Sequence, residues 1–305
     1  MRDLSMRSLR IFEAVASAGS FSKGADALDL TQSAVSQQIR SLEQEVGQKL
    51  FNTLSRPVQL TDAGRELLRH ARVILTQVGV AMDAIASMEG QYKGQLHIGA
   101  VVPSNYFVPK IVAAFLQQFP EVRIKLTVDH RDVLLAMLAE HRLDYVFGGY
   151  PPAEAEVEAE TFARHPHCLV AHSAHPLLGC SDLNWNDLQL EPFILREPGS
   201  STRRFFEHLL QIQRLQVNIN FELQGNEAVK HAVIAGLGIS FLSAHVFQSE
   251  LQLKQIGVLD VIDMPKWLDW CILNRREPQE SMTKQTFKRY VLEHGARYAH
   301  CELGR

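Results

Sequence analysis

The chain has 305 residues, 46% hydrophobic and 21% charged, and these fractions are typical of a globular protein of two or three domains. It has no apolar run of the roughly 20 residues that a membrane helix needs, and no apolar signal segment follows its N-terminus. Four widely spaced cysteines without a CxxC pair indicate free thiols in a reducing compartment, so we expect a cytoplasmic protein with no membrane partner.

The first elements are short helices. Leu4–Ala18 keeps apolar residues at helical spacing, and Gly19 is placed to end that helix. Phe21–Val46 then predicts a pair of short helices joined by a tight turn, with Ser22 and Thr31 as their N-caps. A short helix, a tight turn and a second helix are the parts of a helix-turn-helix motif.

The second helix of this pair has two distinct faces. Its apolar positions fall within roughly 60° of one another on a helical wheel: they are Val35, Ile39, Leu42 and Val46. The opposite face carries hydroxyls, amides and one guanidinium, and no acid: Ser33, Ser36, Gln37, Arg40 and Gln44. Such groups can bond base edges and phosphates in a DNA major groove. A polar stripe alone is typical of an ordinary solvated helix, so the preceding helix and the caps favour DNA reading.

The charge of this region argues against DNA binding. Residues 1–65 contain eight Lys or Arg against seven Asp or Glu, a net charge of only +1, and the whole chain carries −3. A nucleic-acid-binding domain usually has a basic patch or stripe. The interpretation therefore depends on where the charges lie and not on their number.

A hairpin and a long helix follow. Leu50-Phe51 and Val58–Leu60 are short extended segments that predict a wing beside the helices, and Thr61 is placed to cap the next helix. That helix is roughly 40 Å long and ends near Gly90. It has a heptad seam: Leu67, Ala71, Ile74, Val78, Ala81, Ile85 and Met88. The seam favours dimerisation, and the alternative is that it packs on the core of its own domain.

The remaining chain alternates strands and helices. The first half has expected strands at 94–101, 122–128 and 143–149 and expected helices at 106–119 and 132–141. An acidic connector over 151–160 leads to a looser second half with expected strands at 168–172, 192–195, 217–223, 238–242 and 268–274 and helices at 201–213, 227–235 and 283–293. Short connections between such elements predict parallel sheets flanked by helices. Two similar lobes would leave a ligand cleft between them, outside the carboxyl ends of the strands.

The helical head resembles the N-terminal signature of the LysR-type transcriptional regulators. The resemblance is carried by FEAVASAGSFSKGADALDLTQSAVSQQIRSLEQEVGQKLF and VQLTDAGRELL. Four later stretches are similar to the subgroup that controls the operons of the Calvin-cycle carboxylase RuBisCO: GAVVPSNYFVPKIVAAF, FARHPHCLVAHSAHPL, REPGSSTR and VKHAVIAGLGISFLSAH. The resemblance covers the full chain.

The resemblance implies a multidomain chain and a function. It implies a winged helix-turn-helix head (1–60), a linker helix (61–90) and an α/β effector domain like a periplasmic solute-binding protein (91–305), with lobe I at about 91–162 and 266–305 and lobe II at about 163–265. It implies a regulator, and not an enzyme, that binds promoter DNA and RNA polymerase as a homodimer or homotetramer. We expect an activator, with a repressor as the alternative. The implied DNA-binding residues are Gln32, Ser33, Ser36, Gln37, Arg40 and Arg56. The implied wing is arginine-poor here, since Arg56 is its only arginine.

Two predicted helix starts in the effector domain point to an anion site, because free N–H groups at a helix N-terminus attract negative charge. One start lies at Ser104 and Asn105, and the other lies at Ser200–Thr202. With nearby charged residues, the predicted effector site comprises Ser104, Asn105, His130, Arg131, Arg196, Ser200, Ser201 and Thr202. We expect a small anionic metabolite, phosphorylated or NADPH if the subgroup is right, and no other cofactor. Helix capping is the alternative role of each hydroxyl.

Other constellations are weaker. A histidine group at His165, His167, His172 and His175 lacks the spacing of a metal site, and we interpret these as polar loop and strand-end residues. Cys168 lies in an apolar strand, which disfavours a redox switch. The alternative function is a cytosolic binding protein or enzyme that uses the cleft, with the helical head serving only for assembly.

Overall fold

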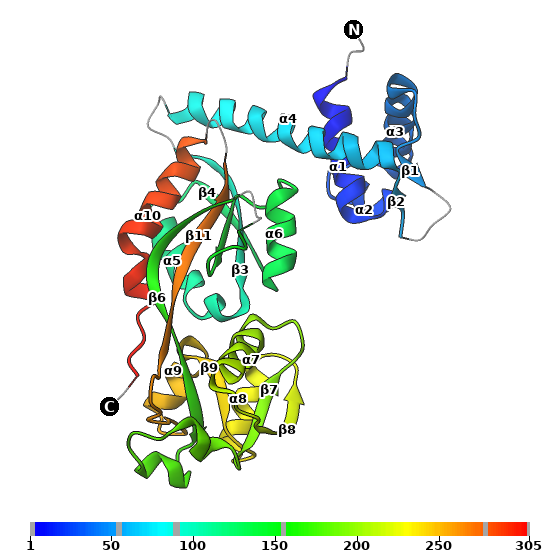
Figure 1. The fold of residues 1–305 in the computed structure, drawn as a ribbon. Helices are drawn as coiled ribbons and strands as arrows, with labels where there is room; N and C mark the ends of the chain where they lie inside the picture. The colour runs from blue at the N-terminus through cyan, green and yellow to red at the C-terminus, as the bar shows by residue number, and fades with distance from the viewer. Residues whose placement is uncertain (1–3, 53–56, 88–91, 154–156, 277–279, 304–305) are drawn as a thin grey trace. The chain divides into compact units, whose positions relative to one another are not determined.

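The structure is a computed structural model that describes residues 4–52, 57–87, 92–153, 157–276 and 280–303. The chain divides into a helical unit, formed mainly by residues 1–94, and an α/β unit that holds most of the remaining chain. A winged helical head, a long helix and a two-lobed α/β domain (Figure 1) confirm the predicted fold class. Over these described ranges, no helix combines the length and the apolar character needed to cross a bilayer.

The head begins with helices that pack around an apolar core: α1 (Met6–Ala18), α2 (Phe21–Asp26) and α3 (Gln32–Val46). Ser5 caps α1, since its hydroxyl accepts a hydrogen bond from the Ser8 N–H at 3.0 Å, and Gly19 ends the helix with a φ of +60°. Thr31 caps α3 in the same way through the Ala34 N–H at 3.3 Å. Local chemistry therefore sets both ends of α1 and the start of α3.

One predicted cap is wrong. Ser20, and not Ser22, caps α2, because its hydroxyl accepts a hydrogen bond from the Lys23 N–H at 3.4 Å while its backbone is extended. Ser22 already lies within the helix. Close by, a Cβ on Gly24 would lie 2.9 Å from the Cα of Val15, so the crossing of α2 over α1 requires glycine.

The wing and the long helix complete the head. Strands β1 (Phe51–Asn52) and β2 (Gln59–Leu60) pair antiparallel, as predicted. Thr61 caps α4 (Asp62–Ser87), since its hydroxyl accepts a hydrogen bond from the Gly64 N–H at 3.0 Å. The buried core unites residues from every helix of the head: Leu9, Ile11, Phe12, Val15, Ala25, Val35, Ile39, Leu42, Leu50, Phe51, Leu68 and Ala71. The predicted inner stripe of α3 is therefore confirmed, with Val46 packed at its edge.

The first lobe of the α/β unit holds the strands that follow α4: β3 (Gly94–Val101), β4 (Val122–Asp129) and β5 (Tyr145–Gly148). Helices pack beside them: α5 (Val108–Gln118), α6 (Arg131–Ala139) and α10 (Met282–Tyr298). A short 3₁₀ helix, η1 (Val102–Tyr106), connects β3 to α5. Strands β3 and β5 are parallel, as the sequence predicts, so their carboxyl ends meet at one edge of the sheet.

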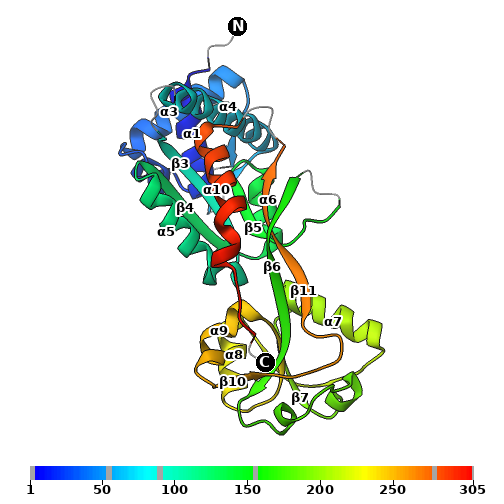
Figure 2. The same cartoon turned by 90° about the vertical axis from the view of Figure 1, so that its left-hand side faces the viewer.

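Two long strands join the lobes. β6 (Val157–His172) and β11 (Lys266–Arg275) pair antiparallel from Val157 opposite Arg275 to His167 opposite Lys266. Figures 1 and 2 show them running side by side from one lobe into the other. Within the described chain, seven strands share this sheet in the order β10-β6-β11-β5-β3-β4, with β9 also paired to β6. A hydrogen-bonded ribbon therefore connects the lobes.

The second lobe is built on the far halves of these strands. Its own strands are β7 (Pro192–Arg196), β8 (Asn218–Leu223), β9 (Ser240–Ser243) and β10 (Ile256–Val258). Its helices are α7 (Ser201–Gln213), α8 (Asn226–Ile234) and α9 (Ala244–Gln252), with 3₁₀ turns η2 (Pro176–Gly179) and η3 (Trp185–Leu188). β7 and β8 pair in parallel, and Phe193 of β7 bridges to Ile239 beside β9.

Two sequence expectations for this unit are corrected. The acidic connector expected over 151–160 is partly strand, since β6 begins at Val157 and not at Cys168. Val157 and Ala159 pack on an apolar cluster of the first lobe, while the alternating Glu158 and Glu160 are exposed. The alternation typical of a strand was therefore present in the sequence, but its charged residues suggested a connector. The sheet is also mixed and not all parallel, because β11 runs antiparallel to β5 and β6.

Candidate functional site

The outer face of α3 presents most of the predicted DNA-binding side chains to solvent. Gln32, Ser33, Gln37 and Arg40 are exposed and Ser36 is half-buried. The Arg40 Nε donates a hydrogen bond to the Ser36 carbonyl at 3.3 Å, and the side chain is exposed. Arg56 lies outside the described residues. This face can offer donors and acceptors to base edges and a cation to a phosphate.

A buried acid fixes α3 against the wing. The Glu43 side chain is only 9% exposed, and its Oε1 accepts a hydrogen bond from the Leu50 N–H at 2.9 Å. Its Oε2 pairs with the Lys49 Nζ at 2.6 Å. The last turn of α3 is thereby tied to the start of β1, which sets the wing relative to the outer face of the helix.

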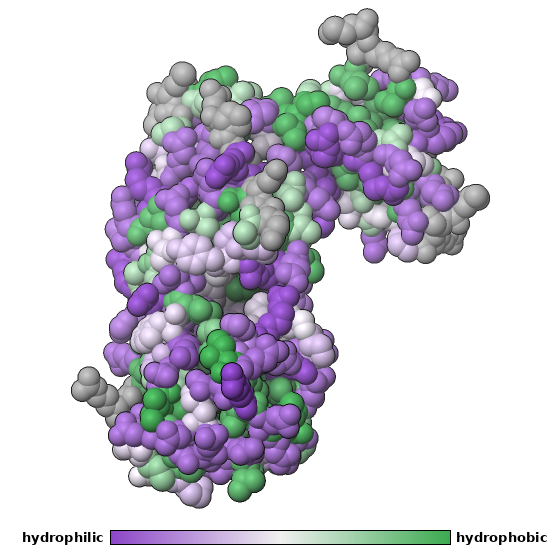
Figure 3. All heavy atoms as spheres, in the orientation of Figure 1, coloured by the Kyte–Doolittle hydropathy of each residue, from purple (hydrophilic) through white to green (hydrophobic). Residues whose placement is uncertain are grey.

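The heptad seam of α4 is divided between the two predicted roles. Its first members, Leu67 and Ala71, pack on the core of the head, as the alternative reading expected. Farther along, Ile74 is 42% exposed and Ile85 is 60% exposed, and Figure 3 shows hydrophobic side chains on the surface along this helix. Met88 lies outside the described residues. The second half of the seam is thus an uncovered apolar stripe of the kind that pairs helices.

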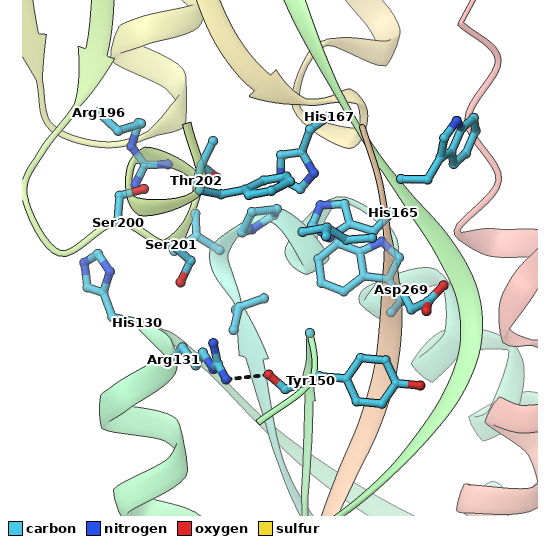
Figure 4. A pocket seen from close by; sticks show the side chains of 18 of the residues that line it. His130, Arg131, Tyr150, His165, His167, Arg196, Ser200, Ser201, Thr202 and Asp269 are labelled. Carbon is cyan, nitrogen blue, oxygen red and sulfur yellow. Dashed lines mark hydrogen bonds between the residues drawn. The ribbon is translucent and has the colours of Figure 1, made fainter. Parts of the chain in front are cut away.

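A pocket of about 400 Å³ lies between the two lobes of the α/β unit (Figure 4). The first lobe contributes residues at or just after the carboxyl ends of β3, β4 and β5: Val101, Val102, Pro103, Asp129, His130, Arg131, Gly149 and Tyr150. The long strands contribute His165, His167, Trp267, Leu268, Asp269 and Trp270, and the second lobe contributes Arg196, Ser200, Ser201, Thr202 and Phe205. Its size suits a small metabolite.

The structure gathers most of the predicted effector residues here. The six that line the pocket are His130, Arg131, Arg196, Ser200, Ser201 and Thr202. Ser104 and Asn105 are not in the lining. Ser104 is fully buried and its hydroxyl donates to the Val101 carbonyl at 2.7 Å, so it stabilises the turn of η1, while the exposed Asn105 lies beside it. The first predicted anion site is therefore a local backbone contact.

The arginines of the pocket differ in how far their charge is compensated. Arg196 is 5% exposed and binds Glu197 through two hydrogen bonds, Nε to Oε2 at 2.8 Å and Nη2 to Oε1 at 2.6 Å. Arg131 donates to the Tyr150 carbonyl, and its buried Nε has no partner. No described carboxylate lies within ion-pair distance of Arg131, and burial together with the neighbouring Arg204 lowers its pKa. Arg131 is thus the cation of the pocket with capacity for an added anion.

The start of α7 adds to this end of the pocket. Ser200 is its N-cap residue, but the Ser200 side chain makes no capping hydrogen bond. The first N–H groups of α7 therefore remain available, and the hydroxyls of Ser201 and Thr202 lie among them. Figure 4 shows His130, Ser200 and Ser201 on one side of the pocket, with His165 and Asp269 on the other.

The aromatic wall of the pocket was not predicted from the sequence. His165 and His167 are not loop or strand-end residues: they lie inside β6 and are 7% and 2% exposed. His165 stacks on Trp270 with ring centroids 3.8 Å apart. Burial, reinforced by His167, lowers the pKa of His165 well below its usual range, and burial lowers the pKa of His167 to about 3. Both rings are neutral at physiological pH. Their spacing of two residues on one strand face was the available signal.

The structure bears on two weaker hypotheses from the sequence, a metal site among the histidines and a redox switch at Cys168. Within the described chain, no group of three or more His, Cys, Asp or Glu residues could hold a metal ion. Cys168 is buried, and burial raises the pKa of its thiol to about 12, with a further contribution from Cys301. A thiol with so high a pKa is a poor redox sensor.

Comparisons with known proteins match nearly the whole chain to one protein family. The family model described as "Bacterial regulatory helix-turn-helix protein, lysR family" matches residues 6–65, and the model of the LysR substrate binding domain matches residues 89–296. The RuBisCO operon transcriptional regulator of Allochromatium vinosum is 37% identical over 99% of both chains. The HTH-type transcriptional regulator CbbR of Sinorhizobium medicae is 36% identical over 98% of this chain and 96% of that protein.

Solved structures give the same fold. The CcmR regulatory domain of Synechocystis PCC6803, solved in complex with 2-PG, is 30% identical with a TM-score of 0.63 and covers 66% of this chain and 97% of that one. Full-length CbnR, solved with its target DNA, has a TM-score of 0.65 over 95% of this chain and 99% of that one, but at 22% identity it supports the fold alone. Because the relatives are named transcriptional regulators, the alternative function as an enzyme or a simple binding protein is not favoured. The chain is a member of the LysR family, and therefore a DNA-binding transcriptional regulator with a ligand-binding domain.

Proposed function

We propose that this chain is a cytoplasmic regulator that controls carbon-fixation genes, as an activator, in response to a small phosphorylated metabolite. The similarity to regulators named for the RuBisCO operon supports the class of target genes. The similarity to CcmR, solved with 2-PG, supports a small anion as the effector. RNA polymerase is the partner through which the bound regulator would act on transcription.

The observation that carries the effector proposal is the anion-binding end of the pocket. Arg131 makes no ion pair with a described carboxylate, since the neighbouring Asp132 pairs with Arg204, and the uncapped start of α7 faces the same cavity. A guanidinium and free helical N–H groups are strong donors to a phosphate or carboxylate. The neutral aromatic wall opposite would hold the uncharged part of the ligand. NADPH is a second candidate, and the cavity of about 400 Å³ favours a smaller molecule.

On the DNA side, Gln32, Ser33, Ser36, Gln37 and Arg40 would read the major groove. Arg56 would add a contact from the wing. Two heads would bind together, because the exposed apolar stripe of α4 would pair with that of a second copy to form a homodimer. Pairs of such dimers would make a homotetramer. The small net positive charge of each head would then be enough for DNA binding, because two linked heads bind more tightly together than either head alone.

Calorimetry on the full chain tests the effector. We expect binding of one or more of 2-PG, phosphoenolpyruvate, a sugar bisphosphate and NADPH, and a loss of at least about tenfold in Arg131→Gln because a charge-assisted contact disappears. Ser201→Ala should weaken binding less. The matched controls are Arg123→Gln, an exposed residue at the start of β4, and Ser249→Ala in α9, which are both outside the pocket. Equal affinity of wild type and Arg131→Gln would refute this site.

A further inference from the structure

The short helix η1 touches the pocket with one end and the second lobe with the other. Val102 and Pro103, at its start, line the pocket. Tyr106, at its end, packs on the apolar cluster of the second lobe that contains Val229 and Val233. A five-residue element of the first lobe is therefore anchored in the second lobe. Any change in the angle between the lobes must move η1 or break this anchor.

The anchor is polar as well as apolar. The Tyr106 hydroxyl donates a hydrogen bond to Oε1 of Glu227, the second residue of α8. The Lys230 Nζ pairs with the same carboxylate at 2.9 Å and with Glu250 at 2.8 Å. It also lies 6.0 Å from the centre of the Tyr106 ring. The phenol thus lies against a charge network whose other members all belong to the second lobe.

The network keeps the phenol protonated and the carboxylate charged. Burial, and then the hydrogen bond to Glu227, raise the pKa of Tyr106. Burial acts to raise the pKa of Glu227, but the hydrogen bonds from Tyr106 and Lys230 outweigh it and the pKa is lowered. The contact is therefore a charge-assisted hydrogen bond at every physiological pH, stronger than one between neutral groups.

We propose that Tyr106 is a positioning residue for effector binding: its bond to Glu227 holds η1, and with it the pocket wall at Val102 and Pro103, in register with the second lobe. Tyr106 itself does not line the pocket. It acts by preorganisation, because a wall that is already fixed loses less freedom when a ligand binds. This inference rests on the proposed function, since it concerns the response of the same pocket.

The test uses the full chain, 2-PG as the probe, and calorimetry. Tyr106→Phe removes the hydroxyl and keeps the ring in its apolar contacts, so we expect an intact fold and a Kd for 2-PG about five- to tenfold higher. Glu227→Ala removes the acceptor, while Lys230 keeps Glu250 as an ion-pair partner, and it should weaken binding similarly. The double variant should lose no more than about twofold beyond either single change, because both remove one interaction. The matched control is Tyr298→Phe, which loses a hydroxyl contact to Arg297 at 2.7 Å on α10.

A purely structural role predicts a different pattern. It would lower the urea midpoint of Tyr106→Phe and leave the Kd of the folded protein unchanged, and that result would overturn the proposal. Independent, multiplying losses in the double variant would also overturn it. A wild-type chain that binds no 2-PG would refute that effector and this inference together, whereas wild-type binding with an unaltered Tyr106→Phe refutes only the role of Tyr106.

Discussion

Replacing Glu197 by glutamine is expected to destabilise the α/β unit by about 2 kcal/mol at pH 7. The carboxylate accepts two hydrogen bonds from the buried Arg196 and one from the Gly225 N–H at 2.9 Å. Burial acts to raise the pKa of Glu197, but these bonds lower it from 4.5 to about 2. A shift of that size corresponds to at most about 3.4 kcal/mol at 1.36 kcal/mol per pKa unit. Solvent screening reduces this free energy, because 17% of the Glu197 side chain is exposed.

The effect has a defined pH window. Because folding lowers this pKa, the stabilisation is fully present above about pH 4.5 and is lost as the pH falls toward 2. The difference between wild type and Glu197→Gln should therefore shrink by about 1 kcal/mol between pH 7 and pH 3.5. Urea unfolding followed by tryptophan emission measures it, since Trp185, Trp267 and Trp270 all belong to the α/β unit.

The matched control is Glu222→Gln. Glu222 pairs with Arg203, but its side chain is 48% exposed and Arg203 keeps a second partner in Glu207 at 2.7 Å. Its loss should cost less than about 1 kcal/mol. Equal unfolding midpoints for the two variants, or a Glu197→Gln effect that does not change with pH, would refute the reasoning.

Further outcomes are expected in the head. Arg40→Ala should weaken promoter binding about tenfold and make the salt dependence shallower by about one unit, as measured by titration at several ionic strengths. Ile85→Asp should raise the dimer dissociation constant in sedimentation equilibrium, while Met82→Asp, exposed but off the heptad seam, should have a smaller effect. Thr61→Ala should cost about 1 kcal/mol of helix stability by circular dichroism, and an unchanged melting curve would contradict the capping role.

The head was predictable because its determinants are local. The hydroxyls of Thr31 and Thr61 cap helices that begin at the next residue, and Gly19 ends a helix at the preceding one. Even the error at Ser20 was a shift of two residues, since two serines offered the same chemistry. Such signals depend on neighbours a few residues apart.

The pocket was predictable only in part, because distant chain segments decide burial there. Nothing near His165 in the sequence reveals that Trp270, more than 100 residues later, stacks on its ring through β11. Likewise, the Ser104 hydroxyl could cap a helix or bind an anion by its sequence, and it does neither, since it bonds the Val101 carbonyl. Glu197, the partner of Arg196, is its neighbour in the sequence. The Gly225 N–H that binds the Glu197 carboxylate is 28 residues away and could not be predicted.

The ribbon of β6 and β11 also determines when each part of the chain can fold during synthesis. Residues 1–94 hold nearly all of the helical unit, so the head can form early on the ribosome. The edge of β5 that pairs with β11 remains unpaired after Gly148 has been synthesised, until synthesis reaches β11 at Lys266. At about 5–20 residues per second that interval lasts roughly 6–24 s. A nascent or truncated chain thus carries a DNA-reading head beside an unsealed sheet edge, which is exposed to aggregation until the last strand arrives.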